Sequence, residues 1–345
     1  MMMTIGGDAH KRTHTFVAVD STGRKVAEHT FSATTDGHLE ALTWAAQWPD
    51  RQWALEDCRQ VTRRLERDLL GAGERVLRVP TQLMAGARKS ARTPGKSDPI
   101  DALSVARAAL REPDLPVAQL AGPERHVKLL VDHREDLVAE RVRTQCRLHW
   151  HLHELMPEHK IGLRTLNRFC VLDDLRSRIE HLDGPVAAIS RELIARVRDV
   201  TVRINALHRE ITQLVAELAP TLLALEGCGP MSAAKIVAEV AGVDRFRSRS
   251  AFARWNGTAP IPVWSANERF RLNRGGNRQV NAAIHRIAIT QWRGPSRGHD
   301  YVQARIDRGT TKRCAIRSLK RRISDEVFAR LHVDLARRPA VAFAA

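Results

Sequence analysis

The first 80 residues alternate between short apolar segments of two-residue period and longer segments of helical period, which restricts the chain to few folds. Three strands separated by polar turns come first and predict an antiparallel meander. A helix capped by Thr34 or Thr35 follows, and two more strands then alternate with a second helix. The expected strands cover residues 4–8, 14–20, 25–31, 52–55 and 75–79, and the second helix covers 61–70. This order predicts an N-terminal α/β domain and is typical of ribonuclease-H-like, resolvase-like nucleases.

Four carboxylates lie at the ends of expected strands or at the start of an expected helix. Asp8 ends the first strand, Glu56 ends the fourth, and Asp98 and Asp101 open a helical run at 102–111. Ligands gather at strand ends on one side of an open α/β sheet, and clustered carboxylates are costly to bury without a cation. Because the set contains only oxygen ligands, it predicts Mg²⁺, or Mn²⁺, rather than zinc.

Asp98 and Asp101 have a simpler interpretation when they are taken alone. Asp98 before Pro99 is a common helix start, with Asp98 as the N-cap and Asp101 facing the positive end of the helix dipole. Asp8 and Glu56 upstream favour the metal site over this capping interpretation.

The net charge of +17 is concentrated in the last third of the chain. Residues 227–345 hold 20 arginines and 3 lysines against 8 acids, which accounts for +15. Arginine binds phosphates bidentately and stacks on bases, so this distribution predicts nucleic-acid binding. A GC-rich genome also enriches arginine, but it does not explain why acids are scarce in one domain only.

Two long amphipathic helices are expected at 124–155 and 185–218, joined by a helical connector. They predict an antiparallel coiled arm that supports oligomerisation. The expected domains are 1–115 (α/β), 123–219 (arm) and 220–345 (basic and mainly helical). Residues 225–231, before a helix at 232–240, suggest a helix-hairpin-helix type turn or a plain helix-helix turn.

A serine in the C-terminal domain lies beside an arginine cluster. Ser265 occupies an irregular loop, and a serine hydroxyl attacks phosphate only where a base or metal activates it and cations hold the phosphate. A basic loop at 88–96 either contacts the backbone of the nucleic acid or is a solvated loop without such a contact. The predicted nucleic-acid-binding residues are Arg88, Lys89, Arg92, Arg269, Arg271, Arg274, Arg278, Lys312, Arg313, Arg317, Lys320 and Arg321.

The cellular compartment is predicted from two features that the sequence does not contain. It contains no apolar run long enough to span a membrane and no basic-then-apolar N-terminus, which predicts a cytoplasmic protein that is nucleoid-associated when bound. Its five scattered cysteines argue against a disulfide framework or a structural zinc site.

Seven short motifs resemble those of the DEDD transposases of the insertion-sequence one-ten group. They are IGGDAHK (5–11), LED (55–57), KSDPIDA (96–102), GCGPMSA (227–233), WNGTAP (255–260), RGGNRQVN (274–281) and the loop of Ser265. The resemblance implies a serine-type DNA recombinase whose acidic tetrad is Asp8, Glu56, Asp98 and Asp101. It also implies Ser265 as the nucleophile, a dimeric to tetrameric assembly, and a structured noncoding guide RNA (the bridge RNA) beside double-stranded DNA. Family members often carry glycine after this serine, whereas Ala266 stands here.

Two other functions remain open from sequence. A resolvase-like nuclease would use the same metal site to cut DNA with water, leaving Ser265 structural. A non-catalytic DNA or RNA binder would be indifferent to the loss of Asp8 or Asp98.

Overall fold

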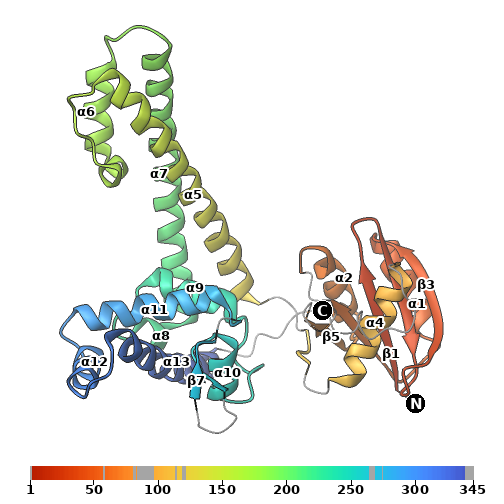
Figure 1. Ribbon diagram of the computed structural model, residues 1–345. Coiled ribbons are helices and arrows are strands. Elements are labelled where there is room, and N and C mark those ends of the chain that lie inside the picture. Colours follow the sequence, from red (N-terminus) through yellow and green to blue (C-terminus); the bar gives the residue numbers. More distant parts are fainter. Residues whose placement is uncertain are drawn as a thin grey trace. The chain divides into compact units, whose positions relative to one another are not determined.

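The computed structural model describes residues 2–56, 59–80, 83, 97–112, 115–118, 122–263, 269–273 and 275–338. The described chain forms two compact units, one within residues 2–118 and the other within 122–338 (Figure 1). Among the described helices, none has the length and apolar character to cross a membrane.

The first unit is built on a mixed five-stranded sheet of order β3-β2-β1-β4-β5. The strands are β1 (Met3–Ala9), β2 (Thr13–Val19), β3 (Lys25–Ser32), β4 (Arg51–Glu56) and β5 (Val76–Val79). The first three pair antiparallel, which confirms the meander, and β4 pairs parallel with both β1 and β5. The α/β prediction for this region is therefore confirmed.

Helices cover both faces of the sheet. They are α1 (Thr35–Ala45), α2 (Arg59–Gly71) and α4 (Asp98–Arg111). The Thr34 side chain accepts the first-turn amide of α1, as the sequence predicts. One face of the sheet packs its large side chains against α1 and α2, and the other packs Val17 and Val19 against Ala102 and Ala106 of α4.

The contact between β1 and α4 is unusually close. A Cβ added to Gly6 would lie 2.2 Å from the Ala102 carbonyl oxygen and 2.5 Å from the Ala106 amide nitrogen. Only glycine lets the helix approach the strand this closely, because any side chain would meet helix backbone. Gly6 thus sets the distance between the end of β1 and the start of α4.

A buried histidine pair links β2 to α1. His14 is 3 % exposed, and its Nε2 lies 3.2 Å from Nε2 of His38, whose Nδ1 lies 2.7 Å from an Asp68 carboxylate oxygen. Burial, together with the nearby His38 and His10, lowers the pKa of His14 to about 4.

We expect this pair to make folding sensitive to mild acid. Unfolded His14 binds a proton near its ordinary pKa of 6.5, whereas folded His14 stays neutral until about pH 4. The stability it contributes is therefore complete above pH 6.5 and is lost as the pH falls through that window, by up to about 3 kcal/mol. Urea unfolding at pH 7 and pH 4.5 should show a smaller loss for His14→Leu than for the wild type. Parallel pH profiles for the two proteins would contradict this.

In the second unit, two long helices form an arm. α5 (Pro123–Leu155) and α7 (Pro185–Leu218) lie side by side (Figure 1), with η1 (Leu163–Asn167) and α6 (Phe169–Ile179) between them in the chain. His126 of α5 lies 3.8 Å from Glu210 of α7, and Glu140 of α5 pairs with Arg196 of α7, so the two helices run antiparallel. Both helices match their predicted extents, whereas supercoiled packing along them stays a prediction.

The rest of this unit is mainly helical, as predicted. It contains α8 (Pro220–Leu223), α9 (Pro230–Val240), α10 (Arg249–Trp255), β6 (Ile261–Val263), β7 (Arg269–Arg271), α11 (Arg278–Arg293), α12 (Arg297–Asp307) and α13 (Lys312–Arg337). Its core also takes in Val127 of α5 and Val215 of α7, so the base of the arm packs with the C-terminal helices. The proposed boundary between residues 219 and 220 stays a prediction, as does the helix-hairpin-helix character of the α8–α9 turn.

Candidate metal centre and nucleic-acid interface

Two of the predicted acids lie at the carboxyl ends of neighbouring parallel strands, Asp8 one residue before the end of β1 and Glu56 at the end of β4. Gly7 of β1 pairs with Leu55 of β4, so Asp8 and Glu56 are the next residues along the two strands. Side chains alternate between the two faces of a sheet. Asp8 shares the face of Gly6, and Glu56 shares the face of Ala54, which packs against α4. Both acids therefore belong to the face that α4 covers.

The other two acids enter from the first turn of α4. Asp101 is buried at 6 % exposure, whereas the Asp98 side chain is 51 % exposed. Ser97 holds the N-cap position, and its side chain makes no capping hydrogen bond. The interpretation of Asp98 as the N-cap is therefore wrong, because Asp98 is already helical and its carboxylate is turned toward His10.

His10 joins this cluster, although it was not among the residues predicted for the site. Its Nε2 lies 3.1 Å from Oδ2 of Asp8 and 3.4 Å from Oδ1 of Asp98. The signal for it was present, because residues two apart at a strand end share one face of the sheet. The sequence predicted a ligand set made only of oxygen atoms, whereas the structure places the imidazole nitrogen of His10 beside these oxygens.

The electrostatics of the cluster favour a bound cation. The Asp8 side chain is 14 % exposed. Burial raises the pKa of Asp8, and the charges of Asp101 and Asp98 raise it further, while His10 opposes the shift. An ionised Asp8 is therefore costly in free energy, because it is buried beside two other acids. A bound divalent ion would remove this cost.

The donor atoms also fit such an ion. One ligand atom from each of Asp8, His10 and Asp98 lies within 4.8 Å of the other two. Asp101 is close enough to affect the pKa of Asp8, and Glu56 ends the adjacent strand on the same face. Carboxylate oxygens suit Mg²⁺ and Mn²⁺, so the residues present fit the predicted cofactor.

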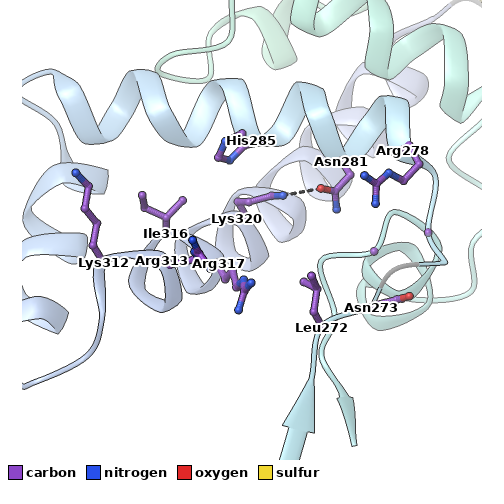
Figure 2. Close-up of a pocket in the computed structure, with 12 residues that line it drawn as sticks. Leu272, Asn273, Arg278, Asn281, His285, Lys312, Arg313, Ile316, Arg317 and Lys320 are labelled. Atoms are coloured by element: carbon purple, nitrogen blue, oxygen red, sulfur yellow. Dashed lines mark hydrogen bonds between the residues drawn. The ribbon is translucent and has the colours of Figure 1, made fainter.

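Several predicted nucleic-acid contacts gather in the second unit. Five cations from α11 and α13 line one pocket (Figure 2): Arg278, Lys312, Arg313, Arg317 and Lys320. Arg271 is exposed on β7, Arg269 lies on the same strand, and Arg321 pairs with Asp325 along α13. Ser265, Arg274, Arg88, Lys89 and Arg92 lie outside the described residues.

Comparisons with known proteins agree on the class of this chain. Residues 5–157 match the family DEDD_Tnp_IS110, described as a transposase, and residues 219–303 match the family described as Transposase IS116/IS110/IS902. A relative from Streptomyces clavuligerus, the "Insertion element IS116 uncharacterized 44.8 kDa protein", is 26 % identical over 382 residues. That match covers 95 % of this chain and 94 % of the relative. The class so defined is the insertion-sequence transposases.

Within that class, the chain belongs to the IS110 family. A solved structure, T. thermophilus RuvC in complex with Holliday junction substrate, matches 31 % of this chain and 92 % of its own at 12 % identity. The TM-score of this match is 0.25.

Proposed function

We propose that this chain cuts and rejoins DNA strands as the transposase of its insertion sequence. In this proposal Asp8, Glu56, Asp98 and Asp101 hold a Mg²⁺ or Mn²⁺ ion, and Ser265 is the nucleophile that forms a phosphoserine link to DNA. The observation that carries it is the meeting of Asp8 and Asp98 beside buried Asp101, in a chain of a transposase family.

The chemistry of these groups suits phosphoryl transfer. A divalent ion bound there would neutralise charge on a phosphate and lower the pKa of an attacking hydroxyl. The buried Asp101 lies in the first turn of α4, so the helix fixes the position of its carboxyl group. His10 bridges Asp8 and Asp98 and orients both carboxylates. A covalent phosphoserine conserves the energy of the broken bond, so rejoining needs no nucleotide cofactor.

The proposed partners are DNA, a structured guide RNA and further copies of the chain. The arginine-rich C-terminal third supports nucleic-acid binding. Large apolar side chains exposed on the arm support assembly into dimers or tetramers, Trp150 being 73 % exposed. The guide RNA rests on the family resemblance.

Hydrolysis by water is the second candidate. The cluster of Asp8, His10 and Asp98 is complete within the first unit, as a nuclease that needs no serine would require. DNA cut by water leaves no protein attached to its end, so the two chemistries differ in their products.

Ser265→Ala separates the two candidates. With Mg²⁺, guide RNA and DNA, we expect the wild type to form a covalent protein–DNA adduct that survives denaturing electrophoresis. The variant should lose the adduct and strand joining by a factor on the order of 10³ or more, because no other group replaces the attacking oxygen. The matched control is Ser250→Ala, an exposed serine of α10, which should behave as the wild type. Full cutting by Ser265→Ala with no adduct from either protein would establish the hydrolytic alternative.

A further inference from the structure

The second unit contains a concave, strongly basic pocket of about 560 Å³. α11 forms one wall and the first half of α13 another, and Leu272, Asn273 and Gly276 line one end (Figure 2). This volume lies within the range of small-ligand sites and exceeds what one phosphate group needs.

The charge of the pocket is unbalanced. Five cationic side chains and His285 line it, and the lining includes no carboxylate among the described residues. Elsewhere in this unit cations meet acids, as in Lys235 with Glu135 and Lys128 with Glu239. Within the described part of the chain, by contrast, the guanidinium groups of Arg278, Arg313 and Arg317 have no ion-pair or hydrogen-bond partner.

Lys320 is held at the centre of this charge. Its Nζ donates to Oδ1 of Asn281 at 2.6 Å, and Asn281 in turn donates to the carbonyl of Asn256 at 2.8 Å. Asn281 is thereby fixed with its oxygen toward the lysine (Figure 2). Burial, followed by the charges of Arg317 and Arg278, lowers the pKa of Lys320 to about 8. Burial and the two arginines make the charged form of Lys320 costly in free energy. An anion bound in the pocket would stabilise that charged form.

Glycines shape the end of the pocket. A Cβ on Gly276 would lie 2.2 Å from the Gly257 amide nitrogen, and Gly257 itself has φ +75°. The two backbone segments can therefore touch only because both residues are glycine. Leu272 and Ile316 add apolar surface beside the cations, so the pocket offers room for a flat apolar group next to a phosphate.

We propose that this pocket binds one nucleotide of a single DNA strand, with its phosphate held by Lys320, Arg317 and Arg278. This proposal rests on one part of the proposed function, namely that the chain binds DNA strands. A duplex keeps its bases stacked inside and its phosphates on a convex surface, whereas a single strand can place a whole nucleotide in a concave pocket. Strand exchange produces such single-stranded segments.

The test is binding of a fluorescein-labelled single-stranded 12-mer to the full chain, measured by anisotropy in EDTA. Arg317→Gln and Lys320→Met should each weaken binding about tenfold, the usual effect of losing a charged phosphate contact. The slope of log affinity against log salt should fall by about 0.7 for each lost contact. Arg297→Gln removes the same charge from an exposed residue that does not line the pocket, and it should change affinity less than twofold.

Other outcomes overturn the proposal. Equal losses for Arg317→Gln and Arg297→Gln would mean that only the overall charge matters. The same loss on duplex DNA as on the single strand would exclude a nucleotide-sized site, and a pocket effect seen with RNA but not DNA would assign the pocket to RNA. Unchanged melting temperatures of the variants rule out misfolding. Because EDTA removes divalent ions and Ser265 is not used, failure of the metal or serine chemistry leaves this result unaffected.

Discussion

Asp8→Asn is expected to abolish metal-dependent DNA cleavage while leaving the first unit folded. Asp8 contacts His10 and lies beside Asp98 and Asp101, so its carboxylate is the central ligand of the proposed site. Losing it should reduce the cleavage rate by a factor on the order of 10³ or more, because the ion both orients and neutralises the phosphate. Cleavage assays with Mg²⁺, together with Mn²⁺ binding by calorimetry, measure the two effects.

Stability distinguishes a lost ligand from a damaged fold. Burial and neighbouring acids already disfavour the ionised form of Asp8, so asparagine should not lower the melting temperature when metal is absent. Asp36→Asn, an exposed carboxylate in the first turn of α1, is the matched control and should retain cleavage. No cleavage by the wild type, with metal affinity and DNA binding unchanged in both Asp8→Asn and Asp98→Asn, would support the non-catalytic binder instead.

Gly6→Ala is the second change with a large expected effect. The new methyl group would meet the backbone of α4 at Ala102 and Ala106, and backbone cannot move aside as a flexible side chain can. We expect a loss of about 2–4 kcal/mol in the free energy of unfolding, at the upper end for overpacking. Urea denaturation of the full chain, followed by signals of the first unit such as Trp53, measures this loss.

The same change should also weaken the metal site. α4 carries Asp98 and Asp101, so pushing the helix away from β1 separates these acids from Asp8. A displacement of about 1 Å can cost about 10²-fold in activity. Gly71→Ala is the matched control, since nothing lies within 4 Å of its added Cβ, and it should leave both stability and metal affinity near wild type. Equal behaviour of the two variants would mean that the close contact of β1 with α4 is unimportant.

Much of the fold could be predicted because its signals are local. The strands of the meander, the cap of α1 by Thr34 and the full extents of α5 and α7 follow from periodicity and capping residues. The short strands β6 and β7 were not predicted, since three residues are too few to show a period. The helix α12 was also missed, although Ser296 caps it, because its N-cap follows directly on the Gly294-Pro295 turn.

The candidate site was partly predictable for a related reason. Asp8 and Glu56 stand at strand ends, and parallel pairing of β1 with β4 brings strand ends together. His10 was missed because a histidine after a strand has many ordinary roles, and only the approach of Asp98 gives this one a role in the cluster. The capping interpretation of Asp98 was wrong because Ser97, one residue earlier, occupies the N-cap.

The sequence by itself determined the class of each segment, the positions of the acids at strand ends and the concentration of arginine in the last third. Those properties depend on neighbours in the chain and on composition. Only the tertiary structure decided that His10 joins Asp8 and Asp98, that Gly6 sets the distance to α4, and that the cations of α11 and α13 face a common pocket. These depend on how elements distant in sequence pack together, and packing is set by the shapes of both partners rather than by the period of either one.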